Sequence, residues 1–347
     1  MAEVDRFRPE DRRGVEALYR RVFGIDAAEA YRLRWDWQYR RNPLTPPEGP
    51  LIWIAREGTT IVGQCAALPV KLTVRGREID AAWGTDVMVA PERQRQGLGE
   101  LLFRAWDRHV GAALGLDPSE AAYRLFRKLG WPDLGAVPCL VKPLTRRAVR
   151  LPRVPVPVNR LLSAVTYPVV QIVARTRPLR AQTQLVRRFD GAFDDLWARL
   201  AGRFDVIVRR DSAYLTWRYL WPPHVRYSIV TLEREGRVDG FAVFRHAHEP
   251  LGRVTLLVDL LADPDDVAGL KALLRRVDRE ARAADSDKIR CFTPHAALRR
   301  VLRRSGYFQV RSTLRLVAKI NAIDVPPSFY RSLDGWHITL GDSDVDR

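Results

Sequence analysis

The chain opens with two stretches in which apolar residues recur at helical spacing, residues 9–23 and 27–41. In the first stretch, Val15, Leu18 and Tyr19 form one apolar stripe. Three apolar runs follow, and turn signals at Gly58 and Gly76 separate them: residues 51–57, 60–74 and 79–89. The pattern therefore predicts two helices and then a set of antiparallel strands.

The next stretch passes from strand to helix through a loop that carries two glycines. Residues 87–89 form a short apolar run, Gly97 and Gly99 close the loop, and helical spacing begins after them. This order directs several backbone N–H groups and the positive end of a helix dipole at one point. Glycine also lets an anion approach the backbone closely. We expect a phosphate-binding site here, while an ordinary strand-to-helix turn is the alternative for the loop taken alone.

The same loop resembles a family motif. Gln94-x-x-Gly97-x-Gly99 is similar to the Q/R-x-x-G-x-G/A pyrophosphate motif of the GCN5-related N-acetyltransferases (GNAT), and the order of elements around it is also that of this family. The resemblance implies that acetyl-coenzyme A (acetyl-CoA) binds here. Its pantetheine amides would pair with the strand edge at Met88 and Val89. Its pyrophosphate would be held by the loop residues Gln94, Arg95, Gln96, Gly97, Leu98 and Gly99.

Residues 117–131 resemble the second motif of the family, Asn-x-x-Ala-x-x-x-Tyr. Ser119 stands at the asparagine position, and Phe126 stands where the family has a tyrosine that often protonates the departing thiolate. We therefore count Ser119 and Phe126 among the expected coenzyme contacts. Phenylalanine cannot donate a proton, so Tyr123, one helical turn earlier, is the candidate catalytic acid. The alternatives are that Tyr123 only packs, and that water or the substrate supplies the proton.

Asp86 is the candidate catalytic base, because it is the acid best placed in the first half of the chain. It recurs in the second half as Asp259, however, and this recurrence favours a structural role for both residues. We see no spacing of side chains that is typical of a metal site, and we expect no metal.

The second half of the chain repeats the first. Trp37-x-Tyr39 recurs as Trp217-x-Tyr219, and in the same order DVMVAPE recurs as DLLADPD and LFRKLGW as VLRRSGY. A period of roughly 175 to 180 residues indicates a duplicated domain. In the second copy acidic residues replace the glycine loop, and they would repel a pyrophosphate. We therefore expect only the first copy to bind the coenzyme.

These observations predict a mixed α+β fold of two tandem GNAT-like domains, each with a mostly antiparallel central sheet flanked by helices. The expected division is an N-terminal domain with the coenzyme loop (residues 1–145), a linker (146–188) and a C-terminal domain without the loop (189–347). The chain has 347 residues, which is enough for two domains of ordinary size.

The net charge of +17 is concentrated in the expected linker, where residues 146–188 hold ten arginines and no acidic residue. A DNA-binding domain more often spreads its basic residues over a folded face, so we expect no DNA partner. The uncharged apolar run 161–174 is too short to span a bilayer. We expect it to pack between the domains. The alternative is a peripheral contact with an anionic membrane surface.

Other features favour a cytoplasmic protein, with the inner membrane face as the alternative site. The N-terminus is charged and lacks the apolar core of a secretory signal. The three cysteines are far apart and fit reduced thiols: Cys65, Cys139 and Cys291. The sequence does not indicate an oligomeric state.

The C-terminal segment, WHITLGDSD, resembles the ending of tandem GNAT proteins that occur with bacterial surface-polysaccharide genes. It could bring Asp342 or Asp344 into a substrate cleft, or be a solvated acidic end. The expected function is acyl transfer from acetyl-CoA to an amine or hydroxyl of a small polar acceptor, such as a sugar or sugar nucleotide. The alternatives are a FemABX-like transferase that uses aminoacyl-tRNA, and a non-catalytic binding protein.

Overall fold

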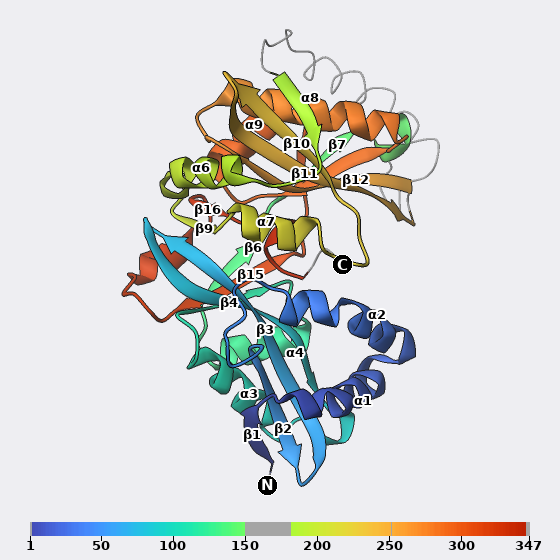
Figure 1. The fold of residues 1–347 in the computed structure, drawn as a ribbon, viewed down its shortest axis with the longest axis vertical. Helices are drawn as coiled ribbons and strands as arrows, with labels where there is room; N and C mark the ends of the chain where they lie inside the picture. The colour runs from blue at the N-terminus through green and yellow to red at the C-terminus, as the bar shows by residue number, and fades with distance from the viewer. Residues whose placement is uncertain (1, 150–181, 251, 345–347) are drawn as a thin grey trace.

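The computed structural model describes residues 2–149, 182–250 and 252–344. The apolar run 161–174 lies outside the described residues. The described chain forms two mixed sheets, each flanked by helices, and this confirms the predicted fold class (Figure 1). No helix of the described residues is long and apolar enough to cross a membrane.

The main part of the first sheet contains β1 to β6 of the N-terminal half and one strand from far along the chain. Its order is β1 (Glu3–Arg6), β2 (Ile52–Glu57), β3 (Thr60–Val74), β4 (Arg77–Val89), β5 (Ala112–Leu116), β15 (Arg315–Ile320) and β6 (Asp133–Ala136). Two further short strands extend it beside β3: β9 (Val206–Val208) and β16 (Trp336–His337). Its helices are α1 (Arg12–Phe23), α2 (Ile25–Trp35), α3 (Leu98–Asp107) and α4 (Glu120–Lys128).

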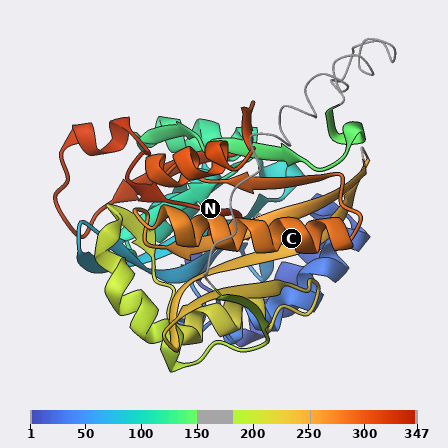
Figure 2. The same cartoon turned by 90° about the horizontal axis from the view of Figure 1, so that it is seen from above.

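The second sheet has an equivalent order of strands. It runs β8 (Gln182–Val186), β10 (Ser228–Arg234), β11 (Arg237–Glu249), β12 (Gly252–Ala262), β13 (Lys288–Phe292), β7 (Cys139–Pro143) and β14 (Phe308–Val310). The helices are α6 (Gly191–Leu200), α7 (Ser212–Tyr219), α8 (Val267–Ala283) and α9 (Ala296–Arg304). The long helix α8 lies across this sheet on the side away from the first half (Figures 1 and 2). In each sheet one central pair of strands is parallel, β4 with β5 and β12 with β13, as a duplicated unit requires.

Within the main order of strands, the two halves exchange one strand each. β7 follows β6 closely in the chain, yet it lies between β13 and β14 of the second sheet. In return, β15 lies between β5 and β6 of the first sheet. The predicted boundary at residue 145 therefore does not separate the strands of the two sheets. Each sheet needs the other half of the chain to cover the strand edges that would otherwise be exposed.

A pair of tryptophans joins the halves with the symmetry that the sequence repeat suggests. The indole Nε1 of Trp37 donates to the carbonyl of Trp217, and that of Trp217 donates to the carbonyl of Trp37, both at 2.7 Å. Their rings stack with centroids 5.5 Å apart. A reciprocal contact of this kind is what a two-fold relation between equivalent surfaces produces. The repeated Trp-x-Tyr segment thus lies at the interface between the halves.

Candidate functional site

The glycine loop leads directly from β4 into α3, as the sequence predicts. After β4 the backbone makes one short turn at residues 91–93, and α3 begins at Leu98. Arg95 and Gly97 have φ of 62° and 85°, which is the left-handed region. Apart from its chain neighbours and its own helix, no atom of the described residues lies within 4 Å of the place where a Cβ on Gly97 would stand. The loop is therefore open to solvent directly in front of the helix.

The N-terminus of α3 offers unpaired donors at this opening. Gly97 is the N-cap residue, and no side chain caps the helix. The first N–H groups of an α-helix have no acceptor within the helix, so those of α3 face the loop. The side chains of Gln94 and Gln96 fold back onto the carbonyls of Val89 and Glu92, at 3.2 and 3.0 Å, and leave the backbone exposed. The geometry suits an anion such as a phosphate.

Beside the loop, β4 has a free edge. β4 and β5 pair only over residues 81–83 and 112–114. Beyond Trp83, the described part of β4 pairs with β3 alone, while the end of β5 pairs with β15. The two parallel strands therefore diverge toward their carboxyl ends. The backbone of Met88 and Val89 borders this gap and can pair with amide groups of a ligand.

Two acidic residues border the same gap. Asp344, near the end of the chain, accepts a hydrogen bond from the hydroxyl of Thr85 on β4. Asp117 follows the last residue of β5, with φ of 53° and its N–H bonded to the carbonyl of Arg315 at 2.8 Å. Partial desolvation raises the pKa of Asp117 above its ordinary value. Asp117 therefore lies at the end of β5, and Asp344 lies against β4.

Comparison with known proteins finds a family match in the first half. A family model described as an acetyltransferase (GNAT) domain matches residues 3–132, which include the loop, the diverging strands and α4. Residues 3–132 therefore resemble a GNAT acetyltransferase domain. No curated protein sequence is significantly similar to the chain.

Solved structures share the fold over nearly the whole chain. A GCN5-related N-acetyltransferase from Anabaena variabilis is 13% identical with a TM-score of 0.65, over 92% of this chain and 73% of its own. A probable N-acyltransferase from Enterococcus faecalis is 13% identical with a TM-score of 0.66, over 93% and 73%. N-Myristoyltransferase from Saccharomyces cerevisiae with bound myristoyl-CoA is 14% identical with a TM-score of 0.55, over 92% and 79%.

Within the GNAT domain, the structure places Asp86 in a buried polar network. Its carboxylate accepts hydrogen bonds from Tyr39 at 2.6 Å, Arg34 at 3.0 Å, Tyr19 at 3.1 Å and Gln38 at 3.2 Å. The backbone of Asp86 has φ of 45°, a strained conformation that surrounding contacts must hold. An acid so fully surrounded by donors fits the structural role better than that of a base.

Tyr123 lies to one side of the gap. Its hydroxyl donates to Asp133 of β6 at 2.7 Å, and the Arg315 guanidinium lies 4.9 Å from its ring centre. The hydrogen bond to Asp133 raises the pKa of Tyr123, so the phenol keeps its proton. Because both β5 and β15 lie between the β4–β5 gap and β6, the β6 residue that this hydroxyl contacts is two strands away from the gap. The geometry disfavours Tyr123 as the catalytic acid.

The two residues matched to the second motif have local structural roles. The hydroxyl of Ser119 accepts a hydrogen bond from the N–H of Ala122 and so caps α4. Phe126 is only 3% exposed and packs against Phe103 and Trp131, with ring centres 4.8 and 4.6 Å away. A side chain held in this core does not reach a ligand in the gap, so the expected coenzyme contact by the Phe126 side chain is not supported.

In the second half, the site equivalent to the loop is already filled by protein groups. The carboxylate of Asp266 caps α8 by accepting from the N–H of Gly269 at 2.9 Å, whereas α3 has no such cap. The Nε2 of His337 donates to the carbonyl of Leu260 on β12 at 2.8 Å. Burial lowers the pKa of His337 to about 3, so this histidine is neutral. Both features argue against a coenzyme in the second half.

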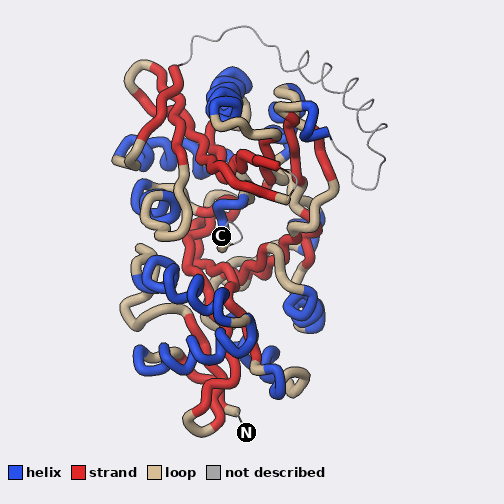
Figure 3. Tube along the Cα trace, turned by 90° about the vertical axis from the view of Figure 1, so that its right-hand side faces the viewer, coloured by secondary structure: helices blue, strands red, loops and turns tan. Residues whose placement is uncertain are grey.

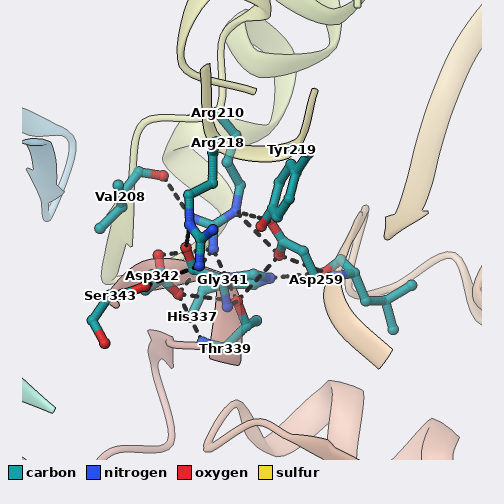
Figure 4. Close-up of polar contacts among 11 residues, drawn as sticks. Val208, Arg210, Arg218, Tyr219, Asp259, His337, Thr339, Gly341, Asp342 and Ser343 are labelled. Carbon is teal, nitrogen blue, oxygen red and sulfur yellow. Dashed lines mark hydrogen bonds and ion pairs between the residues drawn. The ribbon is translucent and has the colours of Figure 1, made fainter. Parts of the chain in front are cut away.

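The segment that carries His337 is held by a buried network (Figure 4). Arg210 bonds Asp259 at 3.0 Å and Asp342 at 2.9 Å, and Tyr219 donates to Asp259 at 2.8 Å. The Arg210–Asp342 pair fixes the C-terminal segment to the second half. The sequence predicts that Asp342 or Asp344 enters a substrate cleft, and the structure gives the two residues different roles. Asp342 anchors the segment, and Asp344 reaches β4.

Asp117 was not among the site residues predicted from the sequence. It stands two residues before the motif position of Ser119, and no family residue marks it. Its left-handed backbone and its position after a strand become evident only in the folded chain.

Proposed function

We propose that the chain is an acyltransferase that moves an acetyl or longer acyl group from acyl-CoA to an amine or hydroxyl of a small polar acceptor. The observation that carries this proposal is the uncapped N-terminus of α3 beside the free edge of β4, within a GNAT domain. The loop backbone from Gln94 to Gly99 would hold the pyrophosphate. The edge at Met88 and Val89 would hold the pantetheine.

The chemistry needs few reactive side chains. The nucleophile on the acceptor attacks the thioester carbon, a C–N or C–O bond forms, and the C–S bond breaks. A backbone N–H of the β4 edge is suited to stabilise the oxyanion that develops on the carbonyl. The proton of the nucleophile passes to a carboxylate, and the thiolate takes a proton from solvent. Because both reactants are held in one gap, their correct orientation accounts for much of the rate acceleration.

One of the two acids that border the gap, Asp117 or Asp344, is proposed to accept that proton. The raised pKa of Asp117 brings it closer to neutral pH, which suits a base. Asp344 has the support of its contact with Thr85. A sugar or sugar nucleotide as acceptor is part of the proposal and rests on the resemblance of the C-terminal segment.

The test measures release of the coenzyme thiol from acetyl-CoA and from myristoyl-CoA while amino sugars, sugar nucleotides and alcohols are added as acceptors. Wild-type protein is expected to release thiol only when an acceptor is present. The variant of the acting base, Asp117→Asn or Asp344→Asn, is expected to lose about 100-fold or more in kcat. Its KM for acyl-CoA should stay unchanged. Full activity in both variants would show that neither carboxylate is the base.

A further inference from the structure

A cavity of about 500 Å³ lies between the two sheets. Figure 3 shows the strands of the two halves facing one another. Its wall includes Asp117 at the end of β5, Leu256 of β12 and Leu340 of the C-terminal segment. Both halves therefore build the cavity, and its size is that of a site for a small molecule.

Four basic side chains line this cavity: Arg245, Lys288, Arg290 and Arg311. The acidic lining residue is Asp117. Glu249 lies nearby and pairs with Lys288 at 3.1 Å and with Arg290 at 2.5 Å. When Asp117 and Glu249 are set against the four basic groups, the wall retains an excess of positive charge. A cavity with this charge attracts anions.

Arg290 adds a specific donor to this charge. Its Nε is buried and has no hydrogen-bond partner among the described residues, although its Nη2 is bonded to Glu249. A buried donor without an acceptor is costly, and a ligand that supplies an acceptor recovers the cost. An anionic oxygen is the acceptor that a guanidinium binds most strongly.

The position of the cavity connects it with the β4–β5 gap. The last pair between these strands joins Trp83 to Leu114, and Asp117 stands three residues after Leu114, just past the end of β5. At about 3.3 Å per residue, the wall of the cavity begins about 10 Å from the point where the strands separate. A molecule about 10 Å long, such as a sugar with a charged substituent, is therefore the size of acceptor that could extend from the cavity to the gap.

We propose that this cavity binds the acceptor, and that the acceptor carries an anionic group, a phosphate or a carboxylate, which Arg290 and its basic neighbours hold. The proposal rests on the proposed acyltransferase function and adds the substrate class. Lys288, Arg290 and Arg311 bind the anionic group, while the nucleophile of the acceptor reaches the gap beside Asp117.

The test is ligand-observed NMR titration of the full chain with three matched sugars: glucose, glucose 6-phosphate and glucuronate. We expect wild-type protein to bind one or both anions at least tenfold more tightly than glucose. The two anionic sugars distinguish phosphate from carboxylate as the recognised group. Equal binding of all three sugars, or no binding of either anion, would overturn the proposal.

Four variants separate the cavity from the coenzyme loop. Arg290→Gln is expected to weaken anion binding at least tenfold, and Arg237→Gln, which removes an exposed arginine outside the cavity, is the control. If Arg290→Gln fails to fold, Arg311→Gln at an exposed position replaces it. Gly97→Glu, which blocks the loop, is expected to keep anion binding. Loss in Gly97→Glu with full binding in Arg290→Gln would place the anion at the loop and refute the proposal.

The same titrations distinguish this proposal from the function on which it rests. Acetyl-CoA binding by the wild type is measured separately. If acetyl-CoA fails to bind while the anions bind through Arg290, the acyltransferase function is wrong and the anion site remains. If acetyl-CoA binds and the anions do not, the function remains and the substrate class is wrong.

Discussion

Asp86 and Asp259 hold equivalent places in the two halves. Each carboxylate accepts a hydrogen bond from the tyrosine of a repeated Trp-x-Tyr segment, Tyr39 at 2.6 Å and Tyr219 at 2.8 Å. Each is also paired with a buried arginine, Arg34 or Arg210. The second copy keeps this arrangement although its loop has acidic residues in place of the glycines. The shared role is therefore to hold the helical segment before the sheet against its central strand.

Replacement of Asp86 tests this role. Asp86→Asn leaves the buried guanidinium of Arg34 without its charge partner, and loss of one member of a buried pair costs about 3 kcal/mol or more. We expect the free energy of unfolding in urea to fall by that amount. Asp80→Asn, on the same strand but with an exposed carboxylate, should change it by less than about 1 kcal/mol. An Asp86→Asn protein with wild-type stability and a hundredfold lower kcat would instead mark a base.

At the scale of single elements, helix α4 shows why Phe126 departs from the family pattern. The ring lies against β5, where the Cζ of Phe126 stands 2.9 Å from the position of a Cβ on Gly115. A tyrosine hydroxyl would extend from that same carbon into the strand. The core formed by α3, α4 and β5 therefore has no room for a tyrosine at position 126.

Phe126→Tyr is accordingly expected to destabilise the protein without improving catalysis. Overpacking and burial of a hydroxyl each cost on the order of 1 to 3 kcal/mol. Thermal unfolding should show a lower Tm, and the kcat for acyl transfer should not rise. Tyr123→Phe, which removes a partly exposed hydroxyl from the same helix, is the comparison. A faster Phe126→Tyr enzyme would mean that position 126 does reach the thiolate.

The sequence predicts those elements whose defining residues are close together in the chain. The glycine loop is such a case, because Gly97 and the start of α3 are adjacent in the chain and their spacing alone defines the turn. The exchange of β7 and β15 was not predictable, since both are short apolar strands that fit either sheet by pattern. The basic cavity was also missed, because Arg245, Arg290 and Arg311 lie on separate elements that only the folded chain brings together.

Over the whole molecule, the C-terminal segment joins the two halves. Arg210 binds Asp342 within the second half, His337 bonds β12, and Asp344 accepts from Thr85 of the first. Together with the exchanged strands and the reciprocal tryptophans, these contacts make each half depend on the other. A change in this segment should therefore lower the free energy of unfolding of both halves together.

His337 provides a pH test of this dependence. Its pKa is lowered to about 3 in the folded state, against about 6.5 in an unfolded chain, so the unfolded state binds the additional proton as the pH falls below 6.5. The free energy of unfolding should fall by about 1.4 kcal/mol between pH 7.5 and 5.5 from this residue. Urea unfolding of His337→Gln over the same range should show a smaller decrease. An identical slope in both proteins would contradict a neutral, buried His337.

We expect one coenzyme site per chain, at the loop before α3, and the stoichiometry of acetyl-CoA binding measures this. Calorimetric titration of the wild type should give one site per chain. Gly97→Glu places a carboxylate where the pyrophosphate would lie and should weaken binding by roughly 100-fold or more. Gly76→Glu, which has a similar left-handed backbone and equally open surroundings in the β3–β4 turn, should bind as the wild type does. Two sites per chain, or undiminished binding by Gly97→Glu, would contradict the account.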